Sequence, residues 1–212
     1  MRRDPSSEAR RAGMVERQLR RRGIADERVL AAMEQVPREA FVPAPLADRA
    51  YDDAALPIGE EQTISQPYIV AAMCELLGLT GTERVLDVGT GSGYAAAVLD
   101  ELAAEVVSVE RIPALADTAR AALDETGHAR VEVRLGDGTL GAPDRAPFAA
   151  VAVAAATPSV PPALYEQLAL GGRMVLPLGG PRGQHLVRIV KTADGPERTA
   201  WLGCRFVPLV EG

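Results

Sequence analysis

The sequence predicts a single α/β domain: a mostly parallel, seven-stranded sheet with an antiparallel C-terminal hairpin and an N-terminal helical cap. Three observations predict it. From Arg84 onward, short apolar runs alternate with helical stretches, which is typical of a parallel sheet covered on both faces. A glycine-rich loop, Gly89 to Gly93, separates the first run from the first of these helices. Two further strand-like segments flank the turn Ala193 to Pro196, which predicts a hairpin.

Helices dominate the first part of the chain. Residues 1 to about 8 are short and polar and contain Pro5, so we expect disorder there. A helix is predicted over 8–22, with Gly23 as its C-terminal stop. Asp26 is placed to cap a second helix over 27–35.

An irregular segment and a third helix complete this region. Residues 37–57 contain four prolines and several apolar anchors, which predicts a packed, ordered loop. The next helix covers 68–77, with Pro67 in its first turn and Ser65 or Gln66 as its cap. The sequence predicts no domain boundary here.

The alternating region and the tail supply the sheet. Strands are predicted at 84–88, 105–109, 131–135, 148–153 and 172–177, helices at 94–103, 113–126 and 161–169, and hairpin strands at 184–191 and 199–207. Together these segments give seven strands.

Composition excludes several classes of protein. The net charge of −6 argues against bulk attraction to nucleic acid or to an anionic membrane. The two cysteines are far apart and the two histidines are isolated, so no metal site is expected. Cys74 lies in an apolar helix and is expected to be a buried thiol. No signal peptide or membrane span is predicted, and we expect a cytoplasmic monomer without nucleic-acid or membrane partners.

The glycine loop has the wrong spacing for a dinucleotide site. Gly89, Gly91 and Gly93 alternate, whereas the pyrophosphate fingerprint places its third glycine three positions after the second. Asp87 precedes the loop within the strand and would repel a pyrophosphate. Glu110 ends the next strand, about twenty residues further on, where an acid accepts hydrogen bonds from ribose hydroxyls. An anionic pocket with a ribose acceptor favours S-adenosylmethionine, which carries a sulfonium and an ammonium group but no phosphate.

Each of these residues also has a simpler interpretation. Asp87 could cap a helix or pair with a base, Glu110 could be a solvated strand end, and Ser65 could be a helix cap. Asp137 follows the third strand in Gly136-Asp137-Gly138, where it could form an Asx turn or bind an adenine amino group. The combination of acids and alternating glycines favours the ligand site.

Several motifs together resemble the protein-L-isoaspartate O-methyltransferase family, from about Met14 to the C-terminus. They are Gln62-Thr63-Ile64-Ser65-Gln66-Pro67-Tyr68, Val85-Leu86-Asp87-Val88-Gly89-Thr90-Gly91-Ser92-Gly93-Tyr94, Val109-Glu110-Arg111-Ile112-Pro113, Gly136-Asp137-Gly138, Gly171-Gly172-Arg173 and Arg205-Phe206-Val207-Pro208-Leu209. The glycine loop alone marks only the wider class of methyltransferases, whereas the first, third and last motifs are more specific.

The resemblance implies a Rossmann-like, S-adenosylmethionine-dependent methyltransferase fold. It implies methyl transfer to the α-carboxylate of L-isoaspartyl residues in damaged proteins and peptides, giving an ester that collapses to a succinimide. Residues 1–80 would form the cap and catalytic segment, and 81–212 the cofactor-binding core with the hairpin. Ser65 matches the catalytic residue. The expected cofactor-binding residues are Thr63, Ile64, Asp87, Gly89, Thr90, Gly91, Ser92, Gly93, Glu110, Arg111, Asp137 and Gly138, and the expected substrate-binding residues are Ser65, Ala155, Pro158, Val207, Pro208 and Leu209.

The methyl transfer depends mainly on how the acceptor carboxylate and the cofactor are positioned. A carboxylate acceptor is ionised at neutral pH and the sulfonium is already activated, so no general base is needed. Ser65 has no evident base and is expected to orient the acceptor or to hold a closed conformation. Residues 207–209 are expected to pair with the substrate as an added extended segment.

Two departures and several alternatives stay open. The family usually has Thr or Gly where this chain has Ala154, and Glu60-Glu61 places two acids just before the catalytic segment. Because the substrate is anionic, a lost hydroxyl contact at Ala154 and the added negative charge of Glu60-Glu61 would both affect the affinity for it. The alternatives are a methyltransferase with another carboxylate, small-molecule or peptide acceptor, a non-enzymatic binder of S-adenosylmethionine, a nicotinamide-dependent dehydrogenase and a nucleic-acid methyltransferase. The glycine spacing and the acidic charge disfavour the last two.

Overall fold

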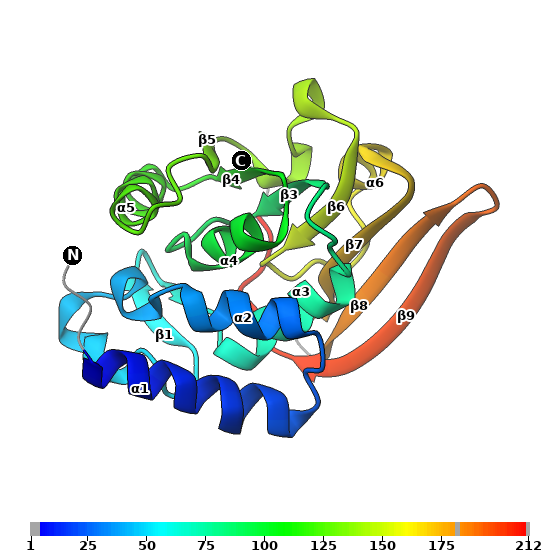
Figure 1. Cartoon of the computed structure of the whole chain (residues 1–212). Coiled ribbons are helices and arrows are strands. Elements are labelled where there is room, and N and C mark those ends of the chain that lie inside the picture. Colours follow the sequence, from blue (N-terminus) through cyan, green and yellow to red (C-terminus); the bar gives the residue numbers. More distant parts are fainter. Residues whose placement is uncertain (1–4, 181–182, 211–212) are drawn as a thin grey trace.

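A seven-stranded sheet forms the centre of the computed structural model, which describes residues 5–180 and 183–210 (Figure 1). Its strand order is β5-β4-β3-β6-β7-β8-β9. The pairs from β5 to β7 are parallel, and the β7–β8 and β8–β9 pairs are antiparallel. The strands are β3 (Arg84–Val88), β4 (Glu105–Glu110), β5 (Glu132–Leu135), β6 (Phe148–Val153), β7 (Leu168–Gly180), β8 (Gly183–Thr192) and β9 (Gly195–Cys204).

Six α-helices and several short helical turns connect and cover these strands. The α-helices are α1 (Pro5–Met14), α2 (Glu27–Gln35), α3 (Pro67–Leu77), α4 (Tyr94–Leu102), α5 (Pro113–Glu125) and α6 (Pro162–Glu166). The shorter ones are η1 (Val15–Leu19), η2 (Arg20–Arg22), η3 (Arg38–Phe41), η4 (Ala44–Arg49), η5 (Gly138–Leu140) and η6 (Pro143–Arg145). Within the described residues, no helix is long and apolar enough to cross a membrane.

Two hydrophobic cores lie on the two faces of the sheet, because neighbouring residues of a strand point to opposite faces. Val85 of β3 joins the first core and Leu86 joins the second. The first core also takes in buried residues of α1–η1, α2, α3 and α4, so the N-terminal cap and the sheet share one interior. In Figure 1 the blue helices of the cap accordingly lie beside α3 and α4, while the β8–β9 hairpin projects away from the helices.

The N-terminal cap is more ordered than the sequence suggests. Residues 1–4 lie outside the described residues, but Pro5 to Arg22 form one continuous helical run, so the expected disorder is wrong for residues 5–8. The stop at Gly23 is confirmed by its left-handed conformation, with φ +97°. The cap at Asp26 is also confirmed, since its side chain accepts hydrogen bonds from the amides of Arg28 and Val29.

A small second sheet was not predicted. β1 (Leu56–Gly59) and β2 (Gln62–Ile64) pair antiparallel, and the expected irregular loop before them contains η3 and η4. Two-residue hairpin turns are recognised in a sequence by glycine or asparagine. The turn of this hairpin is Glu60-Glu61, so the sequence did not indicate it. The consequence is that the segment before Ser65 is a strand held in a fixed register.

The other boundary differences lie around β7. The helix predicted over 161–169 is shortened to α6, and β7 begins four residues earlier than predicted. The amide of Phe148 donates to the carbonyl of Gln167 at 2.8 Å, which draws the chain beyond α6 into pairing with β6. The predicted C-terminal hairpin is confirmed, and its strands meet at a tighter turn than expected.

The connections place a crevice at the carboxyl end of β3. From β3 the chain passes to β4 on one side, and β6 lies on the other, so the strand order reverses at β3. Ligands of open α/β sheets bind at such a reversal point. The loop after β3 is the glycine loop.

Candidate functional site

The glycine loop turns sharply at three alternate positions. Gly89, Gly91 and Gly93 have φ values of +93°, +54° and +90°, a region that L side chains rarely adopt. The amide of Gly89 donates to the carbonyl of Val109 at 2.9 Å, which ties the loop to the end of β4. A Cβ atom on Gly93 would lie 3.3 Å from Ala119, so this glycine also lets α4 approach α5.

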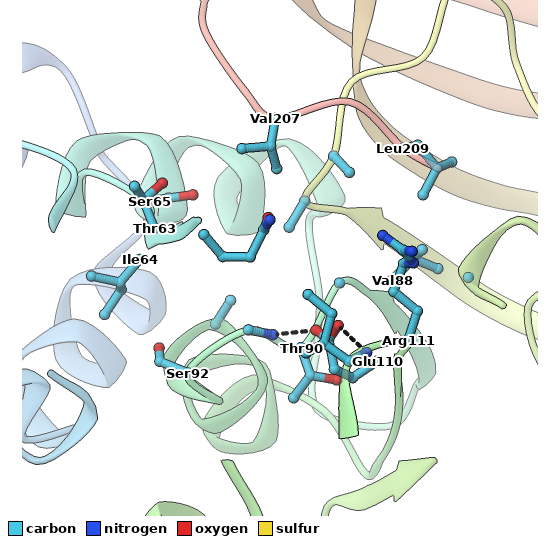
Figure 2. Close-up of a pocket in the computed structure, with 18 of the residues that line it drawn as sticks. Thr63, Ile64, Ser65, Val88, Thr90, Ser92, Glu110, Arg111, Val207 and Leu209 are labelled. Atoms are coloured by element: carbon cyan, nitrogen blue, oxygen red, sulfur yellow. Dashed lines mark hydrogen bonds between the residues drawn. The ribbon is translucent and has the colours of Figure 1, made fainter. Parts of the chain in front are cut away.

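Glu110 fixes the other side of the loop. One carboxylate oxygen accepts a hydrogen bond from the amide of Gly91 at 2.8 Å, and the other accepts from the amide of Ile112 at 3.0 Å. Figure 2 shows both bonds, with Ser65 and Thr63 on the opposite side of the pocket. Because each carboxylate oxygen has two lone pairs, Glu110 keeps acceptor capacity for two hydroxyl groups of a ligand.

Asp87 lies behind this pocket, not in its wall. Strand pairing sets it opposite Ser108, whose hydroxyl donates to one carboxylate oxygen at 2.7 Å. The hydroxyl oxygens of Ser108 and Thr90 are 2.5 Å apart, so hydrogen bonds connect Asp87 through Ser108 to the glycine loop. The other carboxylate oxygen is buried and has no hydrogen-bond partner within the described residues. Burial raises the pKa of Asp87 to about 6, against the lowering effect of Ser108, and the charge of Glu110 adds to the rise.

A first cavity of about 310 Å³ opens between the loop and the segment around Ser65. It is lined by the predicted residues Thr63, Ile64, Ser65, Gly89, Thr90, Gly91, Ser92, Glu110, Arg111, Gly138, Ala155, Val207, Pro208 and Leu209. Four predicted site residues do not line it: Asp87, Gly93, Asp137 and Pro158. We call this space the cofactor cavity, for the ligand that its residues are predicted to bind.

Ten lining residues were not among the predicted site residues: Glu61, Gln62, Val70, Val88, Tyr94, Ala95, Val109, Ile112, Ala154 and Val210. Most of them are immediate neighbours of predicted residues, as Val88 is of Gly89 and Val109 is of Glu110. Apart from Glu61, Gln62 and Tyr94, these residues are apolar, which made them candidates for the core alone. Val70 comes from the first core-facing turn of α3, and no local signal in the sequence points it toward a ligand.

Asp137 and Gly138 play different parts at the end of β5. One oxygen of Asp137 accepts hydrogen bonds from the amide and the hydroxyl of Thr139, at 2.8 and 2.7 Å, which is the Asx-turn alternative. Gly138 lies against the cavity, and a Cβ atom there would come within 2.7 Å of Val88. The adenine contact of Asp137 stays a prediction.

Ser65 does not cap α3. The N-cap is Gln66, which makes no side-chain capping bond, and the Ser65 hydroxyl has no hydrogen-bond partner within residues 5–180 and 183–210. Its carbonyl is held instead, because Nη2 of Arg38 donates to it at 2.7 Å. The hydroxyl is therefore available to a ligand while the backbone is fixed.

Arg38 is fully buried, and its guanidinium has no carboxylate partner among the described residues. Its Nε donates to the carbonyl of Ala50 at 2.7 Å, and its guanidinium carbon lies 4.8 Å from the centre of the Tyr94 ring. Its Nη1 has no partner in the described part of the chain. Burial lowers the pKa of Arg38 below its ordinary value. Arg38 thus connects η3, the catalytic segment and the helix that follows the glycine loop.

A second cavity, of about 620 Å³, adjoins the first. Thr63, Ser65, Ala154 and Val207 line both, so Ser65 lies where the two spaces meet. The remaining walls are Ala55, Gln66, Ile69, Gly183, Gln184, His185, Gly203, Cys204, Arg205 and Phe206. We call this space the acceptor cavity, because it is the approach to Ser65 opposite the cofactor cavity.

Residues 207–209 are already paired with this chain. The amide of Ala156 donates to the carbonyl of Val207 at 2.8 Å, and the amide of Leu209 donates to the carbonyl of Ala156 at 2.7 Å. In an extended segment only the intervening residue, Pro208, faces the other side, and proline has no N–H. The expected addition of a substrate strand can therefore use little more than one carbonyl here.

The site contains no obvious acid–base or metal machinery. His128 lies away from it and contacts the buried carboxylate of Asp100 at 3.0 Å. In the part of the chain that the structure describes, no three or more His, Cys, Asp or Glu side chains are grouped to hold a metal ion. The arrangement can bind a small cationic ligand beside a fixed hydroxyl, and leaves an open approach for an acceptor.

Comparisons with known proteins agree on one family. Residues 9–212 match the family model "Protein-L-isoaspartate(D-aspartate) O-methyltransferase (PCMT)". The chain is 58% identical to protein-L-isoaspartate O-methyltransferase 2 of Marinobacter nauticus, over 96% of this chain and 94% of that one. It is 55% identical to protein-L-isoaspartate O-methyltransferase 1 of Rhodopseudomonas palustris, over 95% and 83%.

Solved structures give the same result. A protein-L-isoaspartate O-methyltransferase, 30% identical, superposes with a TM-score of 0.83 over 93% of this chain and 65% of that one. A putative protein-L-isoaspartate O-methyltransferase of Plasmodium falciparum, in complex with S-adenosyl-L-homocysteine, superposes with a TM-score of 0.85 over 95% and 99%. At 22% identity, the second likeness establishes the fold alone.

Proposed function

The chain belongs to the protein-L-isoaspartate(D-aspartate) O-methyltransferase family, and we propose that the two cavities meeting at Ser65 carry out that family's reaction. The protein is a repair enzyme that transfers a methyl group from S-adenosylmethionine to the α-carboxylate of L-isoaspartyl residues. One observation carries the assignment of the site: Ser65 lines both the cavity at the glycine loop and the cavity behind it.

The residues of the cofactor cavity fit S-adenosylmethionine. Glu61 and Glu110 supply negative charge in its wall, and Asp87 lies behind it, which suits a ligand with sulfonium and ammonium groups. Glu110 retains acceptor capacity for ribose hydroxyls, and Val88, Ile112 and Leu209 offer apolar contact to a purine. When bound, the cofactor supplies the activated methyl group.

The protein's own part is to position the acceptor. An isoaspartyl carboxylate needs no deprotonation at neutral pH, and an in-line displacement depends on the distance and angle of approach. Orientation of this kind can contribute about 7–11 kcal/mol in favourable cases. We assign the orienting contact to the Ser65 hydroxyl, which is unpaired within the described chain and whose backbone Arg38 holds.

Substitution of Ser65 tests that assignment. Ser65→Ala should lower kcat/KM for an isoaspartyl peptide by about ten- to a hundredfold, because a lost orienting contact displaces the acceptor. The dissociation constant of S-adenosylmethionine, measured by calorimetry, should change little. Ser159→Ala removes an exposed hydroxyl outside both cavities and is the matched control. An unchanged kcat/KM in Ser65→Ala would contradict the role.

The acceptor is tested with paired peptides. The protein is incubated with methyl-labelled S-adenosylmethionine and two peptides that differ only in L-isoaspartate or normal aspartate at one position. Base-labile label should enter the isoaspartyl peptide alone. Label in neither peptide, with cofactor binding intact, would point to another carboxylate, small-molecule or peptide acceptor.

The remaining assignments concern the state of the enzyme. We propose that it acts as a monomer in the cytoplasm, with damaged proteins and peptides as its only macromolecular partners. The net charge of −6 supports the absence of nucleic acid among them. Size-exclusion chromatography with light scattering tests the monomer directly.

A further inference from the structure

The acceptor cavity carries a charge pattern that differs from the rest of the chain. The chain has 29 acidic and 23 basic residues, yet the cavity lining includes Arg205 and His185 and no Asp or Glu among the described residues. By contrast, two acids and one base line the cofactor cavity: Glu61, Glu110 and Arg111. The two connected spaces therefore present opposite electrostatic environments on either side of Ser65.

Arg205 and His185 are free to bind a partner. Neither side chain makes a hydrogen bond or ion pair with any described residue, although most arginines of this chain are paired. Gln66, another lining residue, donates to the carboxylate of Asp53 at 2.7 Å, and the same carboxylate pairs with Arg22 at 2.9 Å. Its charge is thus already offset.

The backbone that carries Arg205 is fixed. The side chain of Gln184 on β8 donates to the carbonyl of Phe206 at 3.2 Å and accepts from the amide of Phe206 at 2.7 Å. His185 follows Gln184, and strand pairing sets it opposite Gly203. Arg205 and His185 therefore lie close to the contacts of Gln184 that hold the backbone, where the β8–β9 hairpin meets the segment that leads to Val207.

Few main-chain groups of residues 206–209 are left for pairing with a peptide at this corner. The carbonyl of Val207, the amide of Leu209 and both backbone groups of Phe206 are occupied by this chain. A substrate segment must therefore be held largely through side chains and the cavity walls. Because Arg205 is a cation without a partner among the described residues, acidic residues beside the isoaspartate would gain most.

We propose that the acceptor cavity binds residues flanking the isoaspartate and that Arg205, with His185, selects acidic ones. This inference rests on the proposed function and names the peptide class that its site prefers. Damaged segments rich in Asp and Glu are then the favoured substrates, although the protein itself is acidic. Arg205 is a specificity-determining residue and takes no part in the transfer itself.

A peptide panel tests the proposal with the intact enzyme. Isoaspartyl peptides carry Glu, Gln or Lys at each flanking position in turn, and kcat/KM is measured for each at low salt. At one or more positions, Glu should exceed Lys by about two- to fivefold, the range of an exposed charge pair. The preference should shrink near 0.15 M salt, where charges are screened beyond about 8 Å.

Variants assign the preference to its residues. Arg205→Gln should abolish it, Arg205→Glu should reverse it, and His185→Gln should weaken it. The dissociation constant of S-adenosylmethionine and the melting temperature report whether the cofactor cavity and the fold are intact. Arg198→Gln is the matched control, since Arg198 is an exposed arginine on β9 that lines neither cavity.

The outcomes separate the two proposals. If no isoaspartyl peptide is methylated, the proposed function fails. If all are methylated at rates independent of flanking charge, or if the preference survives in Arg205→Glu, the selection by Arg205 is wrong and the function stands. A preference for Lys in the unmodified enzyme would also overturn the inference.

Discussion

At the scale of single residues, the most unusual group is the buried Asp87. Within the described residues its carboxylate accepts one hydrogen bond, from Ser108, and burial raises its pKa to about 6 from an ordinary value of 3.8. Between these two values the folded protein holds a proton that the unfolded chain has released. The free energy of unfolding therefore falls as the pH rises from about 4 to about 6, by about 3 kcal/mol for a shift of this size.

Asp87→Asn should remove this dependence. Asn is nearly isosteric and can still accept from Ser108, so the variant should be more stable than the unmodified protein above about pH 6 and should lose the advantage below about pH 4. Urea denaturation at several pH values measures the difference. Asp117→Asn on α5, whose side chain is largely exposed, controls for the loss of one negative charge. Parallel curves for Asp87→Asn and the unmodified protein would contradict the argument.

Arg38 is the second residue whose burial has a functional consequence. Arg38→Met leaves the carbonyls of Ala50 and Ser65 without their donor, at a cost of about 1–3 kcal/mol for each buried group. Because one of them belongs to the catalytic segment, kcat for an isoaspartyl peptide should also fall, by about ten- to a hundredfold. Thermal unfolding and steady-state kinetics measure the two effects.

Arg173 provides a matched control for Arg38. It also donates to two main-chain carbonyls, those of Leu77 and Gly78, each at 2.7 Å, but these lie at the far end of α3 from Ser65. Arg173→Met should lower stability while leaving kcat nearly unchanged. Equal losses of kcat in the two variants would show that Arg38 acts only through stability.

Sequence alone could predict the identity of the site residues better than their contacts. The motif around Gly89 and the acid at Glu110 identify the ligand loop, and both line the cofactor cavity. Nothing local indicates that Ser108 stands opposite Asp87, because that contact depends on the register between β3 and β4. For the same reason the sequence could not show that Asp87 lies behind the wall.

At the scale of elements, the turn between β1 and β2 holds conformational strain next to the catalytic segment. Glu60 and Glu61 have φ values of +51° and +58°, and Gly59 pairs with Gln62 across them. Two left-handed residues between paired strands form a type I′ turn, which favours Asn-Gly. An L residue other than Gly or Asn costs about 1–2 kcal/mol in this conformation.

Glu60→Asn/Glu61→Gly should therefore raise the free energy of unfolding by about 1–2 kcal/mol. Chemical denaturation measures the change. Glu60→Gln/Glu61→Gln keeps the strain and removes the charges, so it should leave stability nearly unchanged while showing what the Glu61 carboxylate adds to cofactor affinity. If the Gln pair stabilises as much as the Asn-Gly pair, charge repulsion and not backbone strain is the cause.

The elements of the sheet were largely predictable, and the failures have physical causes. The strands β3, β4, β5 and β6 follow from buried apolar runs, within a residue or so of the prediction. α6 was overestimated because the apolar stretch after Pro162 serves two elements, and only pairing with Phe148 decides where the helix gives way to the strand. The β1–β2 hairpin was missed because its turn consists of Glu60-Glu61, which are not residue types that favour the left-handed conformation.

At the scale of the whole molecule, the two cavities depend on segments far apart in the sequence. Ser65, Ala154 and Val207 come from three different regions, yet each lines both cavities. The family motifs predicted Ser65 and Val207 as site residues and marked Ala154 as a departure, but how charge is divided between the two cavities depends on the assembled sheet. The same assembly determines whether the cap and the sheet are one domain, as the sequence predicts.

The shared first core predicts a single cooperative unit. Met33 of α2 is fully buried and lies against Tyr94, with 3.7 Å between the tyrosine oxygen and the sulfur, while Val85 of β3 belongs to the same core. Met33→Ala should lower stability by about 2–5 kcal/mol. If unfolding is global, native-state hydrogen exchange should show this loss equally at the amides of α2 and at those of β3.

Met174→Ala distinguishes a single domain from two coupled ones. Met174 is fully buried and belongs to the second core, on the other face of the sheet from the first core. In a single domain its loss of stability should also appear at the amides of α2, because those amides exchange only when the whole chain unfolds. If Met174→Ala left α2 unaffected and Met33→Ala left β3 unaffected, residues 1–80 would be a separate unit. The connection from Arg38 to Ser65 would then join two domains, and motion between them could control access to the acceptor cavity.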